Sequence, residues 1–418
     1  MIPRAALQAR AREWGLTEEV VEKDYVLGWL LWGIGSHAAL RDSWIFKGGT
    51  CLKKCFVETY RFSEDLDFTV LEDGPLRPDD LLPVLSEVLD NIEQETGITL
   101  SSRAPVVRMR PDGQSAEGRI YYRGPRGAPG EARVKLDLTY DETVVEPTVR
   151  RNIAHAYDEQ LPGDGAVQCC AFVEVFAEKL RALGQRTRPR DLYDVVNLHR
   201  RADLRDDREQ VQVVLDRKCA YKDVAPPTLA LVTQVDKVTE LRADWQAMLA
   251  HQLPVLPPIE EFIDTLEGVF SWLDGATPPR LQPVPALRER LEPGWLAPPT
   301  ITRWPGGAPL EQIRFAGANH LLVELAYQGT TRLIEPYALR RSQAGNLLIY
   351  AIKTSTGEVR SYRVDRIEGV RVTNTAFVPR YALELSVALP VGTGRRGPEA
   401  MRARRSTARR RTARDFKR

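Results

Sequence analysis

The first 35 residues place apolar side chains at intervals of three or four, the spacing of an amphipathic helix. Within this stretch, Thr17 is followed by Glu18 and Glu19. A threonine before an acidic first turn is typical of a helix N-cap. The pattern therefore predicts helical structure over residues 1–35, with a helix that begins after Thr17.

The next segments have the patterns of strands. Residues 44–46 are a short apolar run that ends at Gly48-Gly49, which predicts a buried strand, a tight turn and then a helix over residues 50–57. Residues 62–70 and 133–139 alternate between apolar and polar positions, the period of a half-buried strand. From residue 171 to about 275 the pattern is mainly helical.

The second half of the chain changes character. Nine prolines fall within residues 275–309, which indicates a linker. Short strand-like runs then recur between turn signals over residues 310–386, and several short strands at this spacing favour a small β-barrel. We therefore expect a domain over residues 1–275, a proline-rich linker over 276–309, a barrel over 310–388 and a tail over 389–418.

The charge is unevenly distributed. The formal net charge is +2, but residues 391–418 contain eleven lysines or arginines and two acidic residues. The remaining 390 residues therefore sum to −7. A basic tail with few large apolar residues is expected to be disordered and attracted to polyanions, although it can equally be a solvated tail with no specific partner.

The overall composition excludes several classes of protein. With 43% hydrophobic and 28% charged residues, the chain has the composition of a globular protein. Its longest apolar stretch, residues 25–35, is shorter than the roughly 20 residues of a membrane span, so we expect no membrane association. Five cysteines without paired metal-binding motifs predict neither a disulfide framework nor a zinc site, and they fit a cytoplasmic protein.

Two carboxylates in the strand over 62–70 suggest chemistry. Asp65 and Asp67 are two positions apart, so they share one face, and two such acids repel each other unless cations lie between them. Paired magnesium ions, which serve phosphoryl and nucleotidyl transfer, meet this requirement. The alternative is two exposed acids on an edge strand. Gly48, Gly49 and Thr50 lie between a strand and a helix, where backbone amides can hold phosphate.

Three further residues fit the same chemistry. Asp137 lies on the polar side of the strand over 133–139, where it could be a third metal ligand. Lys179 falls within the apolar stripe of the helix over 171–183, so it must extend past the core or meet an anion such as a triphosphate. Asp191 could cap the following helix or act in the site.

Four separated blocks carry a resemblance to a known family. They are the runs Glu22-Lys23-Asp24-Tyr25, Lys47-Gly48-Gly49-Thr50-Cys51-Leu52, Arg61-Phe62-Ser63-Glu64-Asp65-Leu66-Asp67-Phe68, and Lys179 with Arg190-Asp191-Leu192-Tyr193-Asp194. In this order they resemble the AbiEii/AbiGii-type nucleotidyltransferase toxins of the DNA polymerase β-like superfamily. The resemblance implies an α+β fold, a mixed sheet with flanking helices and a helical C-terminal half.

The resemblance also implies a function. The family transfers a nucleoside monophosphate from NTP to an acceptor, which in related MenT-type toxins is the 3′ end of tRNA. We therefore expect a magnesium-dependent nucleotidyltransferase of a bacterial toxin–antitoxin or phage-defence system, with a possible antitoxin partner. Asp65, Asp67 and Asp137 would hold two Mg²⁺ ions, Gly48, Gly49, Thr50 and Ser63 would bind the nucleotide, and Lys179 would neutralise phosphate. Asp191 would orient the nucleotide or the attacking hydroxyl, unless Asp194 faces the site instead.

The C-terminal part resembles a WYL domain, an SH3/Sm-like barrel that serves as a ligand or nucleic-acid sensor. The resemblance lies in the runs Arg332–Arg340, Gly345–Ile349 and Arg360–Ile367, in which Leu347-Leu348-Ile349 replaces the namesake residues. Five arginines suit an anionic ligand: Arg332, Arg340, Arg360, Arg363 and Arg366. They could instead form ion pairs with Glu335, Asp365 and Glu368.

A different class of function also fits the sequence. The chain could be a WYL-containing nucleic-acid-binding regulator in which the transferase fold is catalytically silent. The intact pair Asp65 and Asp67 argues against this alternative, since a silent descendant needs no aligned acids.

Overall fold

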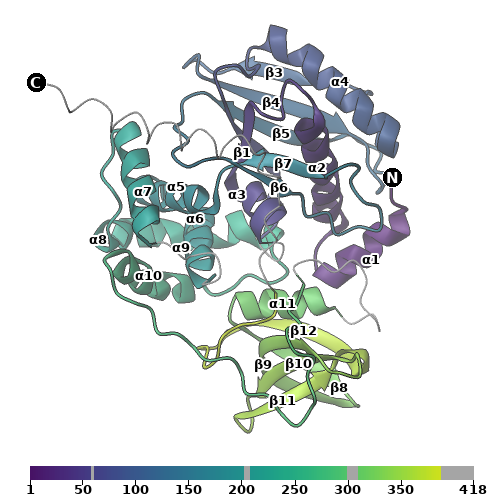
Figure 1. Cartoon of the computed structure of the whole chain (residues 1–418), viewed down its shortest axis with the longest axis vertical. Helices are drawn as coiled ribbons and strands as arrows, with labels where there is room; N and C mark the ends of the chain where they lie inside the picture. Colours follow the sequence, from purple (N-terminus) through teal and green to yellow (C-terminus); the bar gives the residue numbers. More distant parts are fainter. Residues whose placement is uncertain (58–60, 202–207, 299–308, 387–418) are drawn as a thin grey trace, which may run out of the picture.

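The computed structural model describes residues 1–57, 61–201, 208–298 and 309–386. The basic tail expected over 389–418 therefore lies outside the described residues. The first part of the chain forms a seven-stranded mixed sheet in the order β3-β4-β5-β2-β1-β7-β6 (Figure 1). The strands are β1 (Trp44–Lys47), β2 (Asp65–Val70), β3 (Val106–Met109), β4 (Ser115–Tyr122), β5 (Ala132–Thr139), β6 (Val149–Asn152) and β7 (Ala166–Cys169).

Helices pack against this sheet and confirm the mixed α+β class. The preceding helices are α1 (Arg4–Trp14) and α2 (Glu18–Ser36), and α4 (Pro78–Thr96) follows β2. The Thr17 hydroxyl accepts a hydrogen bond from the Val20 amide, which confirms the predicted cap of α2. Gly33 of α2 lies against Ile92 and Val88 of α4, so the two helices pack closely together.

The chain turns from sheet to helices at α5. The helices are α5 (Phe172–Gln185), α6 (Pro189–Arg200), α7 (Arg208–Tyr221), α8 (Leu229–Val232), α9 (Val235–Leu249) and α10 (Ile259–Leu273). They form a group beside the sheet (Figure 1). The helical pattern read over residues 171–275 is thereby confirmed in type. Among the described helices, none combines the length and apolar character required to cross a membrane.

The C-terminal part forms a second, five-stranded antiparallel sheet in the order β11-β10-β9-β8-β12. Helix α11 (Leu310–Ala318) precedes the strands β8 (Leu321–Tyr327), β9 (Thr330–Arg341), β10 (Leu347–Lys353), β11 (Glu358–Arg363) and β12 (Ile367–Ala376). The expected closed barrel is not found, because β11 and β12 are the two edges and no ladder joins them within the described residues.

Both faces of this open sheet are nevertheless buried, which explains how it is stable without closure. Alternate residues of β10 belong to two different clusters: Ile349 packs in the main core, whereas Leu348 and Tyr350 pack in a second cluster. Val284, from the stretch expected to be a linker, is buried in that second cluster. The residues around Val284 therefore cover a face that barrel closure would otherwise bury.

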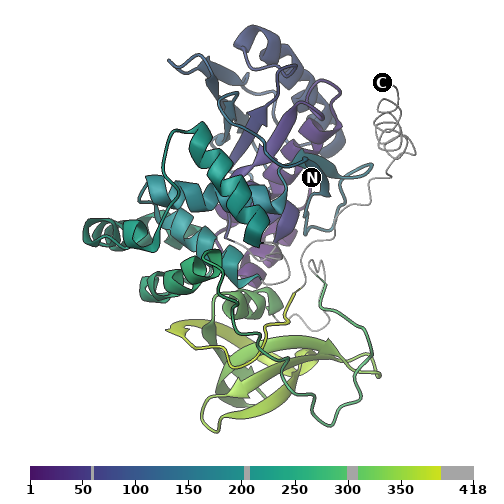
Figure 2. The ribbon, with the colours of Figure 1, turned by 60° about the vertical axis from the view of Figure 1, so that its left-hand side comes forward.

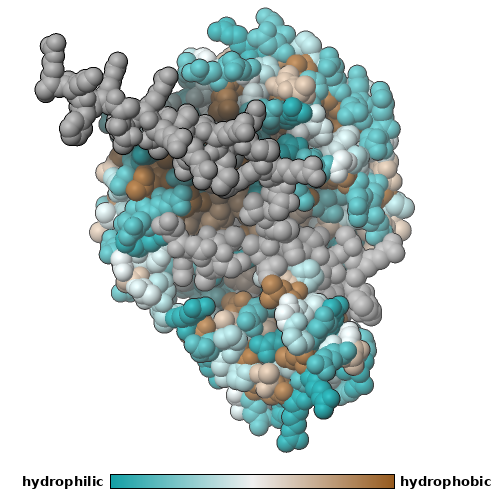
Figure 3. All heavy atoms as spheres, viewed as in Figure 1, coloured by the Kyte–Doolittle hydropathy of each residue, from teal (hydrophilic) through white to brown (hydrophobic). Residues whose placement is uncertain are grey.

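The two sheets are joined through α11. This helix lies between the C-terminal sheet and the rest of the molecule in both views (Figures 1 and 2). The Gln312 side chain donates hydrogen bonds to the carbonyl oxygens of Arg12 (3.1 Å) and Glu13 (3.2 Å) at the end of α1. The main hydrophobic core is continuous from α1 to α11 and the strands that follow. The surface above, over α4 and its neighbouring strands, is mostly hydrophilic (Figure 3).

Candidate active site

Strand β2 brings the two predicted carboxylates to one face. Leu66 and Phe68 are completely buried, whereas Asp65 and Asp67, at the alternate positions, are half-buried. The period of two in a strand is the physical reason for this separation. The shared face expected for Asp65 and Asp67 is thus present.

Strand β5 adds the third acid. It pairs with β2 in parallel, and the register places Asp137 beside Asp67 and Lys135 beside Asp65. Asp137 accepts a hydrogen bond from Lys135 at 2.8 Å and forms an ion pair with Arg110. The three carboxylates expected to act together therefore lie on two adjacent strands, and Asp137 is paired with two cations.

The electrostatics of this cluster favour a bound cation. Burial raises the pKa of Asp67 to about 6, Lys47 opposes this rise, and Asp137 and Asp65 add to it by repulsion. Burial also raises the pKa of Asp65, with Lys135 opposing and Asp137 adding to the rise. Carboxylates that are difficult to ionise together provide the oxygen ligands that Mg²⁺ prefers, so these residues fit a divalent cation.

Gly48 makes room for Asp67. Its backbone has a φ of +79°, and a Cβ atom there would lie 2.3 Å from the Asp67 Oδ2 atom. Gly49 is similarly tight, since its Cβ would lie 2.5 Å from an Arg61 nitrogen. The glycine pair therefore allows the loop to lie directly against the carboxylate face, as close approach of backbone to a ligand requires.

The two glycines begin a short helix, α3 (Gly48–Cys51), which continues as a π-helical segment, η1 (Leu52–Phe56). Thr50 is 1% exposed, and its hydroxyl donates to the Asp65 carbonyl oxygen at 2.5 Å. This contact fixes the start of β2 rather than presenting the hydroxyl to a ligand. Ser63 is half-buried just before β2.

Lys179 lies in a buried chain of ion pairs between α5 and α6. Its Nζ atom is 2.7 Å from Asp194 and 3.3 Å from Asp191. Asp194 also accepts two hydrogen bonds from Arg61, at 2.7 and 2.9 Å, and Asp191 is bound by Arg186 at 2.8 Å. The inward lysine therefore meets anions of the protein itself.

This network decides the orientation of both aspartates on α6. Asp191 is 1% exposed and Asp194 is fully buried, and both face Lys179. Asp191 lies in the first turn of α6, whose N-cap is Arg188, so it is not the cap residue. Arg61 and Lys179 hold the pKa of Asp194 far below its usual value against the effect of burial. Arg61 and Lys179 thus favour the ionised form of Asp194, which anchors Lys179.

Sequence reasoning missed several charged residues near the carboxylates. Lys47 faces Asp67 across the β1–β2 register and forms an ion pair with Glu142. Lys23 of α2 binds Glu64, next to Asp65, at 2.7 Å. Burial lowers the pKa of Arg190 of α6, and the charges of Asp65 and Glu64 oppose this effect. The motif positions of Lys47, Lys23 and Arg190 were the signal that could have found them.

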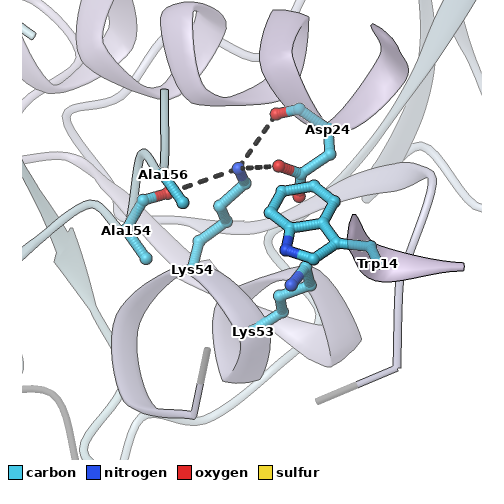
Figure 4. A pocket seen from close by; sticks show the side chains of 6 residues that line it. All are labelled: Trp14, Asp24, Lys53, Lys54, Ala154 and Ala156. Atoms are coloured by element: carbon cyan, nitrogen blue, oxygen red, sulfur yellow. Dashed lines mark hydrogen bonds and ion pairs between the residues drawn. The ribbon is translucent and has the colours of Figure 1, made fainter. Parts of the chain in front are cut away.

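A small pocket at η1 has a structural role. It is lined by Trp14, Asp24, Lys53, Lys54, Ala154 and Ala156 (Figure 4). Lys54 Nζ binds the Asp24 carboxylate at 2.8 Å, the Asp24 carbonyl oxygen at 2.9 Å and the Ala154 carbonyl oxygen at 3.3 Å. These hydrogen bonds of Lys54 anchor η1 to α2. The three carboxylates are not among the residues that line the pocket.

Three cysteines lie together in the fold, although one of them is distant from the other two in the sequence. The sulfur atoms of Cys51, Cys55 and Cys169 lie within 4.8 Å of one another, and all three residues are completely buried. The sequence contained no spacing motif for such a group, because β7 brings Cys169 to the helix from a distance. The three cysteines belong to the main hydrophobic core.

The five arginines of the C-terminal sheet are mostly engaged within the protein. Arg340 donates to the Val284 carbonyl oxygen at 2.7 Å, and its guanidinium lies 4.6 Å from the centre of the Tyr350 ring. Arg332 bonds carbonyl oxygens at the β8–β9 turn. Arg360 pairs with Glu358 at 2.5 Å and Arg363 with Asp365 at 2.6 Å, while Arg366 is exposed.

The alternative ion pairs suggested by the sequence are present in part. Asp365 does bind Arg363. Glu335 instead binds Arg380, and Glu368 accepts hydrogen bonds from the Gly329 amide.

Comparison with known families gives two matches. The family described as "Nucleotidyl transferase AbiEii toxin, Type IV TA system" matches residues 29–270, and the WYL domain family matches residues 309–372. Both regions agree with the resemblances drawn from the motifs. No curated protein matches the chain.

Two solved structures show limited similarity. One is MenT4, a nucleotidyltransferase toxin from Mycobacterium tuberculosis H37Rv, with 22% identity and a TM-score of 0.43; the match covers 66% of this chain and 91% of that one. The other is the proteasome accessory factor B/C (PafBC) of Arthrobacter aurescens, with 11% identity and a TM-score of 0.15, covering 92% of this chain and 73% of that one.

Proposed function

We propose that this chain, which belongs to the AbiEii nucleotidyltransferase toxins because more than half of its residues match that family, transfers a nucleoside monophosphate from NTP to the 3′ end of a tRNA. One observation carries this proposal: the register of β2 and β5 aligns Asp65, Asp67 and Asp137 beside the Gly48-Gly49 loop. We place the boundaries of the transferase at residues 1–275 and of the WYL unit at 310–388, with the linker at 276–309 between them.

The proposed reaction is a nucleotidyl transfer in which the carboxylates would hold the metal ions. The acceptor hydroxyl loses its proton to solvent, and its oxygen forms a bond to the α-phosphorus. The bond from that phosphorus to the oxygen that bridges it to the β-phosphorus breaks, and pyrophosphate leaves with that oxygen. Asp65 and Asp67, supported by Asp137, would hold two Mg²⁺ ions. When bound, these ions polarise the phosphate and lower the pKa of the attacking hydroxyl. Such catalysis depends on positioning and on charge neutralisation.

The loop and the ion-pair chain would bind the nucleotide. Gly48 and Gly49 bring backbone close to the carboxylates, while Thr50 fixes β2 and Ser63 lies at the start of that strand. Lys179 would contribute positive charge toward the phosphates from its place on Asp191 and Asp194; on the pKa of Asp67 it acts in the same direction as Lys47, the larger cationic influence. Asp191 and Asp194 would hold Lys179 in place, so their role is positioning.

Label transfer tests the proposal directly. The protein is incubated with each of the four labelled NTPs, Mg²⁺ and total tRNA, and we expect label to appear in RNA with one or more NTPs. Asp67→Asn should abolish transfer, and Asp90→Asn, on the exposed surface of α4, should leave it unchanged. Transfer by Asp67→Asn above a tenth of the wild-type rate would contradict the assignment of the metal ligands.

We also propose that the WYL unit regulates the transferase by binding a nucleic acid. Arg360, Arg363 and Arg366 support this, because the first two have exposed ion pairs that an anion can displace. Replacing Arg363 and Arg366 together with alanine should uncouple transfer from nucleic acid added in trans. An identical response from wild type and variant would contradict this regulatory role. A cognate antitoxin and a cytoplasmic location complete the proposal.

A further inference from the structure

One half of the N-terminal sheet has an open polar face. Along β5, Val134, Leu136 and Leu138 are buried, whereas Arg133, Lys135 and Asp137 are exposed or half-buried. In β4, Gly118 and Ile120 are buried while Arg119 is exposed. Helices α2 and α4 pack with the buried side chains in the main core. The outward side chains of β3, β4 and β5 therefore form a surface that the described helices leave uncovered.

This surface is continuous with the carboxylates of the candidate active site. The register of the sheet places Asp65 beside Lys135, and Lys135 beside Arg119. Adjacent strands are about 4.8 Å apart, so the Arg119 backbone lies roughly 10 Å from that of Asp65. Lys135 and Arg119 thus form a short row of cations that begins beside Asp65, while Arg108 lies in the neighbouring row, beside Glu117.

Several of these cations are available to a ligand. Arg108 and Arg133 are exposed, and neither has an ion-pair partner within the part of the chain that the structure describes. Arg119 pairs with Glu117 at 2.9 Å, but its side chain is 44% exposed, so the pair is weak. Arg103 is exposed and lies 4.0 Å above the centre of the Tyr121 ring, which holds a further cation at the rim of this surface.

The chemistry of the reaction explains the need for such a surface. Three carboxylates close together repel a polyanion, yet the acceptor hydroxyl must reach them. Cations beside the carboxylates offset this repulsion and raise the local concentration of an anionic substrate. Arginine suits the purpose, because its guanidinium group binds phosphate through paired hydrogen bonds.

We propose that the open face of β3, β4 and β5 binds the phosphodiester backbone of the single-stranded end of the acceptor and directs its terminal hydroxyl to Asp65 and Asp67. We call this surface, made of Arg108, Arg119, Arg133 and Lys135, the acceptor face. The inference rests on the proposed function, since it assigns the acceptor of that reaction to a surface. RNA and DNA share the backbone chemistry, so the experiment includes both.

The test measures binding of the full-length protein to a labelled single-stranded oligonucleotide over a range of salt concentrations. The variant is Arg108→Ala with Arg133→Ala, which removes two exposed charges that have no described partner. The matched control is Arg77→Ala with Arg217→Ala, which removes two exposed charges elsewhere, before α4 and on α7. Circular dichroism and the affinity for NTP check that both variants are folded and keep the nucleotide site.

Each phosphate contact contributes about 0.7 to the salt dependence of single-strand binding. The acceptor-face variant should therefore reduce the slope by about 1.4 and weaken binding at least tenfold near 0.1 M salt, whereas the control should match wild type. A greater loss for RNA than for DNA identifies RNA as the ligand, and an equal loss identifies the shared backbone.

Two results would overturn the inference: a wild type that binds neither oligonucleotide, or a variant whose slope equals that of the control. These results differ from failure of the proposed function. A wild type that binds through the acceptor face but transfers no nucleotide would contradict the transferase proposal and leave the surface assigned. A wild type that transfers normally with an unchanged variant would contradict the surface alone.

Discussion

At the scale of single residues, Asp67 is the position at which the properties of the site converge. It adjoins Gly48, faces Lys47 across one strand pair and Asp137 across the other, and its pKa is raised to about 6, chiefly by burial. An acid with a raised pKa in the folded state favours the protonated form. Its contribution to stability is full below its ordinary pKa of 3.8 and is lost as the pH rises through about 6.

Asp67 should therefore couple stability to metal and pH. Without metal at pH 7.5, Asp67→Asn should stabilise the folded protein by about 1–3 kcal/mol, because it removes a disfavoured charge. Mg²⁺ should raise the melting temperature of wild type more at pH 7.5 than at pH 5, since protons compete for the carboxylate. Thermal melts with and without Mg²⁺ measure both effects. Equal Mg²⁺ effects on wild type and Asp67→Asn would contradict the prediction.

Lys179 gives a second prediction. Lys179→Met should destabilise the protein by about 3 kcal/mol, because Asp191 and Asp194 lose a buried partner. It should also raise the KM for NTP if the ammonium acts on phosphate. Lys218→Met is the control, since Lys218 is equally buried but its nearest partner is Glu174 at 2.8 Å. Denaturant unfolding and steady-state kinetics separate the two effects. A normal KM in a destabilised Lys179→Met variant would show that the lysine is only structural.

At the scale of elements, the turn between β1 and α3 is the feature that shapes the site. Gly48, directly after β1, has a left-handed backbone conformation, and its lack of a side chain lets the chain lie against the Asp67 carboxylate. The Thr50 hydroxyl then connects α3 to β2. The π-helical segment that follows places Lys54 toward Asp24 of α2. Helix, turn and strand are therefore held as one unit.

Gly48→Ala should damage this unit in two ways. The positive φ costs roughly 1–2 kcal/mol for any residue with a Cβ atom, and the clash with Asp67 must move the carboxylate. Gly127→Ala isolates the first effect, because Gly127 has a φ of +65° but nothing within 4 Å of its Cβ position. We expect Gly127→Ala to lose stability alone and Gly48→Ala to lose at least a hundredfold in transfer rate as well. Similar rates for the two variants would show that the loop does not position Asp67.

At the scale of the whole molecule, the C-terminal sheet packs against the first part of the chain through α11. The main core is shared, and Gln312 of α11 bonds the end of α1. Two carboxylates lie at this contact: Glu13, held by Arg10 at 2.6 Å, and Glu311, held by Arg314 at 2.7 Å. A signal from the sheet to the carboxylate site would therefore travel through packed elements.

This contact should respond to pH. Burial raises the pKa of Glu13 to about 7 and Glu311 adds to the rise by repulsion, while Arg10 and Arg314 oppose it. Its contribution to stability is full below its ordinary pKa of 4.5 and is lost as the pH rises through about 7. Glu13→Gln should therefore flatten the dependence of melting temperature on pH between about 4.5 and 7. A pH dependence identical to that of wild type would contradict the role given to Glu13.

The sequence by itself determined the elements with strict periodicity and the residues within them. The alternation in residues 62–70 and 133–139 placed Asp65, Asp67 and Asp137 on polar faces, and the apolar stripe of α5 marked Lys179 as buried, because both patterns depend only on local geometry. The blocks of motif residues identified both families.

Only the tertiary structure decided which distant residues meet. The parallel pairing of β2 with β5 set Asp137 beside Asp67, and the packing of α5 on α6 gave Lys179 the partners Asp191 and Asp194, where the sequence left an anionic ligand open. The predicted closed barrel was wrong for the same reason. The second face of the sheet can be buried either by the segment that contains Val284 or by pairing of the edge strands. These segments are distant in the sequence, so no local pattern predicts which of them buries the apolar surface.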